Sequence, residues 1–333
     1  MYLGVDGGGT KTAFALVGHD GRLVARATTG SCYHPEVGLE AVREVLTDGV
    51  QAVLAAAGIE RAAITQAFFG LPAFGEDPAA DAQLATIPGA ILGDRRCVVG
   101  NDMICSWAGA LGCKDGISVI AGTGSMAYGV FDGRDARSGG WGEVFGDEGS
   151  AFWIAREGLT LFARMSDGRL TPGPLHALIR RHFELKNDLD LAGQINGLTT
   201  HERSAIAAIA TVVADAAIAG DHEAVELYAR AAAELADMIV AVRHTLGVPA
   251  ERALPVSYTG GVFQAGALIL KPLADELRLA GRYSLAPPQL EPVIGAAIHA
   301  ARLAGVSLPL DHLIGHGTAR PMAAAGAEPI GGA

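Results

Sequence analysis

Hydrophobic and polar positions at the start of the chain follow a pattern that predicts three short strands. Tyr2–Val5 is an apolar run that stops at an aspartate and three glycines, and Thr10–Val17 then follows a period of two. A period of two is typical of a half-buried strand. Leu23–Thr28 repeats it after the turn at His19–Arg22, so we expect strand, glycine turn, strand, turn and strand.

The pattern then changes to the spacing of a helix. Leu39–Ala57 carries apolar residues every three to four positions, and Gly58 can end that helix in a left-handed conformation. Two apolar runs predict strands at Gln66–Gly70 and Cys97–Val99, and helical spacing returns at Asp102–Leu111.

A second strand, glycine turn and strand open the other half of the chain. The strand that starts at Ile117 is interrupted at Gly122–Gly124 and resumes over Ser125–Phe131. The two glycine turns match at an offset of 115 positions, which pairs Gly7 with Gly122, Gly9 with Gly124 and Thr10 with Ser125. Two such matches indicate a duplicated unit with a boundary near residues 113–116.

Helices dominate the rest of the second half. Helical periodicity predicts them over Ser150–Met165, Leu175–Phe183, Glu202–Ala219, Asp221–Leu246, Gln264–Ala280 and Val293–Leu303. Pro255–Thr259 is predicted as a strand that runs into two glycines. From Gly315 onward the chain is rich in glycine, alanine and proline without any period, so we expect a flexible tail over 315–333.

Composition narrows the class of protein. The 333 residues correspond to about two domains, and 50% of them are hydrophobic, enough for a sizeable core. A net charge of −11 without a basic run makes nucleic acid and anionic membranes poor partners. The four cysteines lack metal or redox spacing, and we find no secretory leader or membrane span, so we expect free thiols and a cytoplasmic location.

The first glycine turn, DGGGTKT, can bind phosphate. Glycines let the backbone approach a phosphate with its N–H groups, and threonine hydroxyls add donors. Asp6 ends the first strand, where its carboxylate can hold Mg²⁺ directly or through water. The spacing fits neither a Walker A loop nor a dinucleotide fingerprint, and a plain glycine-rich hairpin is the alternative. The nucleotide contacts expected here are Gly8, Gly9, Thr10, Lys11 and Thr12.

Two further glycine motifs can complete a nucleotide site. The turn Gly122–Ser125 can clamp a polyphosphate with the first turn, because the two come from different halves of the chain. Thr259–Phe263 places small residues at a strand-to-helix junction where a flat ring could approach, although two glycines before a helix are also common without a ligand. The contacts expected from these motifs are Gly122, Thr123, Gly124, Ser125, Gly260, Gly261, Val262 and Phe263.

Asp102 is the candidate general base. It follows the predicted strand Cys97–Val99, and a carboxylate at the end of a strand can accept a proton from a hydroxyl nucleophile in a cleft. The alternative is capping of the next helix by Asn101 or Asp102. The glycine loop at 139–149 combines an aromatic residue with carboxylates, which suits sugar hydroxyls; its alternative is a turn before a helix that starts near Ser150.

Taken in order, these motifs resemble the sugar-kinase/actin/Hsp70 superfamily and, within it, the N-acetylglucosamine kinase branch of the BadF/BadG/BcrA/BcrD ATPase family. The resemblance extends to about Leu303 and is carried by Asp6–Thr12, Asn101–Asp102, Ala121–Ser125, Gly139–Ala155 and Thr259–Phe263. It implies an α/β fold of two ribonuclease-H-like domains, 1–114 and 115–290, that close over ATP and Mg²⁺. It also implies that the last helix, about 291–305, packs back on the first domain.

The resemblance further implies a role for each motif. Asp6 belongs to the Mg²⁺ site, Asp102 takes the proton of a sugar 6-hydroxyl, and Thr10 and Thr123 lie on the phosphate loops. The implied amino-sugar contacts are Tyr33, Asn101, Asp102, Gly140, Trp141, Gly142 and Asp147. Tyr33 stands where sugar kinases of this branch usually carry Asn, which leaves the sugar open between N-acetylglucosamine, glucosamine and another hexose derivative.

We therefore expect an ATP-dependent kinase for an amino sugar, N-acetylglucosamine above all. The alternatives are a glucosamine or other hexose kinase, or an ATP-binding sensor or ATPase without sugar kinase activity. The family's other branch activates dehydratases through an iron–sulfur cluster. Its cysteine is absent from Gly146–Ser150, so we do not expect that role. Relatives are commonly dimers, and a homodimer stays open.

Overall fold

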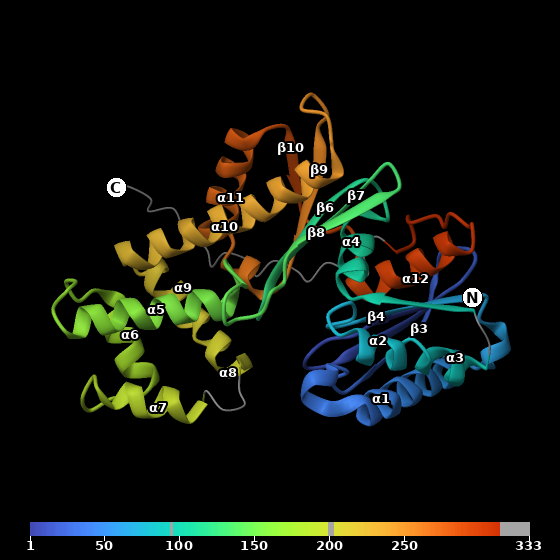
Figure 1. Ribbon diagram of the computed structural model, residues 1–333, viewed down its shortest axis with the longest axis horizontal. Coiled ribbons are helices and arrows are strands. Elements are labelled where there is room, and N and C mark those ends of the chain that lie inside the picture. Colours follow the sequence, from blue (N-terminus) through green and yellow to red (C-terminus); the bar gives the residue numbers. More distant parts are fainter. Residues whose placement is uncertain (94–95, 199–202, 314–333) are drawn as a thin grey trace, which may run out of the picture.

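The computed structural model describes residues 1–93, 96–198 and 203–313, and it contains two sheets of five strands (Figure 1). The first sheet has the order β3-β2-β1-β4-β5. Strand β1 pairs antiparallel with β2 and parallel with β4. The strands of this first sheet are β1 (Tyr2–Asp6), β2 (Thr12–Val17), β3 (Leu23–Thr29), β4 (Gln66–Leu71) and β5 (Cys97–Asn101).

The second sheet repeats the topology of the first. Read from β8, its order is β8-β7-β6-β9-β10, with β6 antiparallel to β7 and parallel to β9. Its strands are β6 (Gly116–Ala121), β7 (Ser125–Phe131), β8 (Arg134–Gly139), β9 (Leu254–Thr259) and β10 (Tyr283–Ala286). The predicted duplication is thereby confirmed, because β1 and β6 occupy equivalent places and each leads into a glycine turn.

Helices cover both faces of the first sheet. One face packs against α1, whose backbone is kinked at Gly38 and which ends at Gly58 in the predicted left-handed conformation. The other face packs against α12, so closely that a side chain on Gly4 would lie 2.3 Å from the backbone nitrogen of Ala297. The helices and the 3₁₀ turn of this half are α1 (His34–Ala57), η1 (Arg61–Ala63), α2 (Pro78–Leu84), α3 (Ile87–Leu92), α4 (Met103–Leu111) and α12 (Pro292–Leu303).

A block of helices separates β8 from β9. Helix α10 packs on β7 and β8 and also on α11, whereas α5 to α9 extend away from the sheet (Figure 1). Their buried residues form one hydrophobic cluster with the sheet. The elements are α5 (Ala151–Ser166), α6 (Pro174–His182), α7 (Asp190–Leu198), α8 (Arg203–Ala208), α9 (Ala210–Ile218), α10 (His222–Leu246), η2 (Gly261–Ala265) and α11 (Ala267–Ala280).

Two of the predicted helices are wrong in detail. The described part of the helix expected over Glu202–Ala219 is divided between α8 and α9. The helix expected over Gln264–Ala280 is interrupted by Gly266, whose φ of 59° is in the left-handed region and ends the 3₁₀ turn η2 before α11 begins. Strand β8 was not predicted, because its sequence RDARSG lacks apolar alternation.

Two of the three tryptophans are buried. Trp107 and Trp153 are 3% and 6% exposed. The four cysteines form no disulfide with one another, and Cys97 is less buried than the other three. Among the described residues, no helix combines the length and the apolar character needed to cross a membrane. The tail expected over 315–333 lies outside the described residues.

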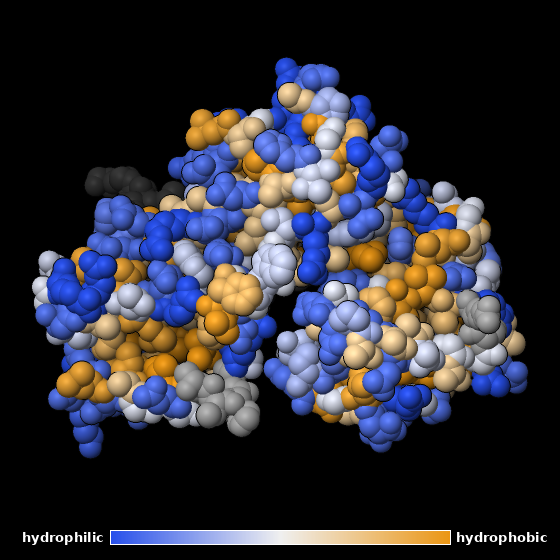
Figure 2. Space-filling view, viewed as in Figure 1, coloured by the Kyte–Doolittle hydropathy of each residue, from blue (hydrophilic) through white to orange (hydrophobic). Residues whose placement is uncertain are grey.

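The chain crosses from the first half to the second between α4 and β6 and returns with α12. Figure 2 shows the two halves as separate lobes with a groove between them. The helical block and the first sheet face each other across this groove, so a ligand held there touches both halves. The domain limits at 114 and 290 stay predictions.

Candidate active site

A cavity of about 390 Å³ lies between the two halves. Both glycine turns and the loop after β5 contribute to its wall, because each follows the carboxyl end of a strand: the central strands β1 and β6 for the turns, and the edge strand β5 for the loop. The predicted site residues that line it are Gly9, Thr10, Tyr33, Asn101, Asp102, Gly122, Thr123, Gly124, Ser125, Gly140, Gly142 and Asp147. Its wall also contains Glu36, Glu76, Glu143 and Arg203, which the sequence analysis did not single out.

The first glycine turn is anchored at its base and open at its tip. The backbone N–H of Gly7 donates to the carbonyl of Gly70 at 2.8 Å, and a side chain on Gly7 would lie 2.4 Å from the Cys32 sulfur. A β-carbon on Gly9 would meet no described atom within 4 Å, and Gly9 is exposed, like Thr10. The tip can therefore approach a phosphate with its backbone.

Thr12 does not fit the predicted contact with phosphate. Its side chain is fully buried, and its hydroxyl donates to the carbonyl of Gly30 at 2.8 Å. The hydroxyl therefore ties β2 to the end of β3 instead of facing the cavity. Gly8 and Lys11, from the same motif, are not among the residues that line the cavity.

The second glycine turn is held against the start of α5. The carbonyls of Gly122 and Thr123 accept from the backbone N–H groups of Ala151 and Phe152 at 2.8 and 3.4 Å. Ser150 caps that helix, since its Oγ accepts from the backbone N–H of Trp153 at 3.1 Å. With these carbonyls occupied, the turn presents its free face to the cavity.

Ser125 closes the second turn and is less free than the sequence suggests. Its side chain is buried, and its hydroxyl donates to the carbonyl of Glu148 at 2.6 Å. Its backbone N–H donates to Asp147 Oδ1 at 3.3 Å. Ser125 thus joins the turn to the loop at 139–149, and the carbonyl of Ser125 accepts from the N–H of Gly140 at 2.9 Å.

Asn101 and Asp102 stand at the start of α4, where the sequence left open whether they cap the helix or whether Asp102 serves as a general base. Asp102 occupies the N-cap position of α4 without a side-chain capping bond, and Asn101 Oδ1 accepts from the backbone N–H of Met103 at 3.1 Å. Asn101 Nδ2 donates to the carbonyl of Phe74 at 2.9 Å, which fixes the loop after β4. The carboxyl group of Asp102 lines the cavity, where burial raises its pKa to about 6 against the opposing effect of the backbone N–H groups beside it.

Asp6 lies at the end of β1 and has no counterpart in the second half, where Ala121 ends β6. Removal from solvent, and secondly repulsion from Asp102, raise the pKa of Asp6 to about 8. A cation beside these carboxylates would stabilise both ionised forms. The described part of the chain holds no cluster of three or more metal-ligating side chains. Mg²⁺ suits such a place, since it needs few carboxylates when phosphates and waters complete its shell.

An ion-pair network ties the helical block to the glycine loop. Arg203, at the start of α8, forms an ion pair with Asp147, and its Nε lies 3.2 Å from Glu143 Oε2. Asp147 is 2% exposed and has a φ of 59°, which few residues other than glycine adopt. Burial raises the pKa of Asp147, and Arg203 opposes that rise. The network holds the carboxyl group of Asp147 in the cavity wall.

The opposite wall is formed by the start of α1. Tyr33 is half-buried and lines the cavity with Glu36. Burial raises the pKa of Tyr33, while the charges of Arg203 and Glu143 on the other half also act on it. Tyr33 therefore faces the Arg203 network across the cavity.

Some predicted contacts lie outside this cavity. Val262 and Phe263 are buried in the core of the second half, and the Phe263 ring packs on Tyr258 at 4.9 Å. Gly260 lies against the base of the second turn, where a side chain would come within 2.3 Å of the Ala121 carbonyl. A nucleotide could therefore contact this motif through its backbone and at Gly261. Trp141 is 65% exposed and does not line the cavity.

Two sheets of one topology, with a glycine turn from each at a shared cavity, define a two-domain ATPase of the actin-like class. The chain matches the model of the BadF/BadG/BcrA/BcrD ATPase family over residues 3–300 and belongs to this family. The resemblance inferred from the motifs is confirmed, as is the fold class.

Relatives and a solved structure are similar over most of their length. The N-acetylmuramic acid/N-acetylglucosamine kinase of Clostridium acetobutylicum is 31% identical over 264 residues, which cover 78% of this chain and 84% of that protein. The N-acetyl-D-glucosamine kinase of Dictyostelium discoideum is 26% identical over 286 residues, with coverages of 83% and 90%. A Chromobacterium violaceum structure, described as an N-acetylglucosamine kinase, has a TM-score of 0.70 and 27% identity, covering 89% of this chain and 96% of that chain.

Proposed function

We propose that this chain transfers the γ-phosphoryl group of ATP to the 6-hydroxyl of an amino sugar, with N-acetylglucosamine as the first candidate. The observation that carries the proposal is the cavity itself, where two phosphate-type turns and the partly buried carboxyl of Asp102 meet between the two halves. The names of the similar kinases support the same substrate class. A homodimer and a cytoplasmic location stay predictions.

The two glycine turns bind the donor. Phosphoryl transfer requires positioning and charge neutralisation more than covalent chemistry by the protein. Backbone N–H groups at Gly9 and on the second turn, with the hydroxyls of Thr10 and Thr123, are donors for phosphate oxygens. Asp6 would hold Mg²⁺, which neutralises phosphate charge when bound.

Asp102 activates the acceptor. A carboxylate with a pKa of about 6 is mostly ionised at neutral pH, so it can accept the proton of the sugar hydroxyl as that oxygen attacks phosphorus. Asn101 holds the backbone beside it through its bonds to Met103 and Phe74. The base is thereby positioned by the fold before substrate arrives.

The sugar is held between the Tyr33 wall and the Arg203 network. Asp147 and Glu143 offer carboxyl oxygens as acceptors for sugar hydroxyls, and Arg203 opposes the rise in the pKa of Asp147 that burial causes. Gly140 and Gly142 line the cavity beside them, with φ values of 73° and 83° that suit glycine. The phenol of Tyr33 supplies one further hydrogen-bonding group on the other side.

The test is ADP release from Mg²⁺-ATP with N-acetylglucosamine, glucosamine, N-acetylmannosamine, glucose or no sugar. We expect one amino sugar to stimulate release and Asp102→Asn to lower kcat by about 10²- to 10⁴-fold. Asp48→Asn, a change at an exposed carboxylate on α1, is the matched control and should leave kcat unchanged. Release that needs no sugar and survives Asp102→Asn would contradict the proposal and favour an ATPase or sensor.

A further inference from the structure

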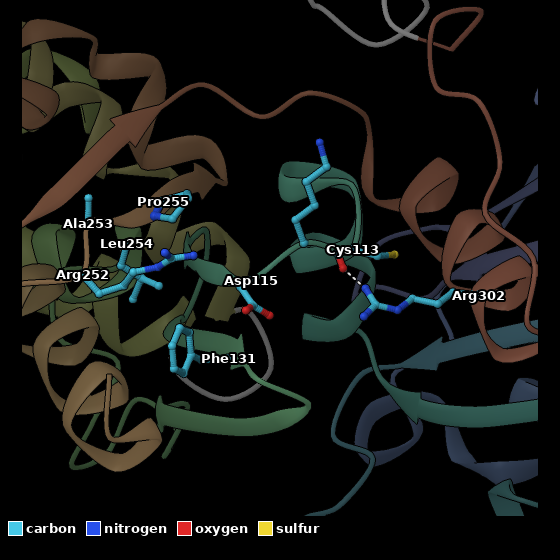
Figure 3. Close-up of a pocket in the computed structure, with 9 residues that line it drawn as sticks. Cys113, Asp115, Phe131, Arg252, Ala253, Leu254, Pro255 and Arg302 are labelled. Carbon is cyan, nitrogen blue, oxygen red and sulfur yellow. Dashed lines mark hydrogen bonds between the residues drawn. The ribbon is translucent and has the colours of Figure 1, made fainter. Parts of the chain in front are cut away.

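A second cavity, of about 450 Å³, lies where the two halves are joined (Figure 3). It is lined by the connection between α4 and β6, by the loop before β9 and by the end of α12. The active-site cavity is at the other end of β6, a strand of six residues, so the two cavities are on the order of 20 Å apart. They share no lining residue.

The lining of this junction cavity is cationic in an acidic protein. Lys114, Arg252 and Arg302 contribute three positive charges, against one negative charge on Asp115. In the described part of the chain none of the three cations forms an ion pair with an acidic side chain. Since the whole chain carries a net charge of −11, this is a local concentration of positive potential that favours an anion.

The remaining lining is apolar. Phe131, Leu254 and Pro255 line the cavity, and Figure 3 shows Phe131 and Arg252 on the side of the second half. The volume is within the range of about 300 to 1,000 Å³ that small-molecule pockets occupy. Cations beside an apolar wall match a ligand with an anionic group and an organic body.

Hydrogen bonds and close packing hold the segments that carry these cations. Arg302 donates to the carbonyl of Cys113 (Figure 3), and Trp107 Nε1 donates to the carbonyl of Lys114 at 3.1 Å. Gly116 packs so closely on β9 that a side chain there would lie 2.6 Å from the Pro255 carbonyl. The connection between the halves is therefore held in place on both sides, and the cavity is preformed.

We propose that the junction cavity is a second binding site, for a small organic phosphate. The phosphate bonds Lys114 and Arg302 from the first half and Arg252 from the second, while the organic part lies against Phe131 and Pro255. Arginine and lysine are the side chains that most often bind phosphate oxygens. Because the ligand touches both halves, it favours one orientation of the halves and affects the active site by linkage.

The test is titration of the full chain with inorganic phosphate and with glycerol 3-phosphate, followed by ³¹P NMR line broadening. Single changes Lys114→Gln and Arg252→Gln should each weaken binding by about three- to tenfold, because each removes one exposed cation from the phosphate. The matched controls are Lys271→Gln and Arg278→Gln on α11, which should leave the affinity unchanged.

Asp115→Asn should increase the affinity for phosphate, a change that damage to the fold would not produce. It removes the one negative charge of the lining, so both probes should bind more tightly. Glycerol 3-phosphate should bind more tightly than inorganic phosphate if the apolar wall contacts the organic part. No saturable binding up to about 10 mM of either probe, or equal losses in the α11 controls, would overturn the proposal. This test measures phosphate binding and not sugar kinase activity, so its result does not depend on whether the proposed kinase function is correct.

Discussion

At the scale of single residues, burial decides which carboxylates can do chemistry. Asp102 and Asp147 both line the cavity, and burial raises the pKa of both. Within the described part of the chain, Asp147 is the one of the two with a cation bonded to it, Arg203. Asp102 is thereby left as the carboxylate that can exchange a proton with a substrate near neutral pH.

The activity should depend on pH through Asp102. Because its pKa is raised to about 6, the base is protonated and inactive below that value. We expect kcat/KM to rise with pH by about tenfold per unit below pH 6 and to level off above it. A pH–rate profile of the wild type checks this. A profile that is flat between about pH 5 and 7, measured at constant ionic strength, would exclude Asp102 as the titrating base.

Asp6 can be tested as the magnesium residue without an activity assay. Binding to the native state raises the melting temperature, so Mg²⁺ with a non-hydrolysable ATP analogue should stabilise the wild type. Asp6→Asn should abolish the part of this shift that depends on Mg²⁺. It should also stabilise the ligand-free protein, by an amount that grows from the ordinary aspartate pKa of 3.8 to about pH 8 and is then constant, because it removes a carboxyl that is costly to ionise in the fold. Retention of the Mg²⁺-dependent shift would place the ion elsewhere.

Arg203 should act as a positioning residue. Its removal leaves the buried Asp147 without its cation, so we expect Arg203→Ala to raise the KM for sugar by about tenfold or more and to leave the KM for ATP nearly unchanged. Arg203→Lys keeps the charge and should recover part of the loss. An equal rise in both KM values, without recovery by lysine, would indicate damage to the fold instead.

At the scale of elements, the glycine turns were predictable and the Arg203 network was not. The turns are local: a strand, two or three glycines and a hydroxyl residue recur at a fixed offset, and the sheets reproduce that repeat. Arg203 reaches Asp147 from 56 positions further along the chain. Nothing in the periodicity of its helix indicates that its first residue reaches back to the glycine loop.

The same distinction between local motifs and contacts made by the whole fold explains why some residues have other contacts than the sequence predicts. Thr12 belongs to a phosphate-type motif, yet its alternation in β2 turns the side chain inward, where its hydroxyl bonds Gly30. Asn101 and Asp102 were both candidates for the cap, and only the fold shows that Asp102 holds the N-cap position while Asn101 supplies the side-chain hydrogen bond. Strand β10 was missed because its four residues pair at the sheet edge without a clear apolar run.

The loop that contains Trp141 gives an optical test of substrate binding. Trp107 and Trp153 are buried, whereas Trp141 is 65% exposed, so the red-shifted part of the emission belongs to Trp141. If a bound sugar covers this indole, N-acetylglucosamine should shift the emission to the blue, and Trp141→Phe should abolish the shift. A shift that persists in Trp141→Phe would remove Trp141 from the sugar site.

At the scale of the whole molecule, each of the two proposed substrates touches groups from both halves. Asp102 and Tyr33 come from the first half, and Arg203 and the second glycine turn come from the other. The relative orientation of the halves therefore sets the distance between phosphate and sugar. Closure over both substrates would also exclude the water that competes with the sugar hydroxyl.

The most direct test of the central claim is to identify the product by ³¹P NMR. The wild type and Asp102→Asn are incubated with Mg²⁺-ATP and N-acetylglucosamine. We predict a phosphomonoester signal whose coupling to the C6 protons places it at the 6-hydroxyl, formed by the wild type and nearly absent with Asp102→Asn. Inorganic phosphate as the sole product, or a sugar phosphate that Asp102→Asn forms equally fast, would contradict the account.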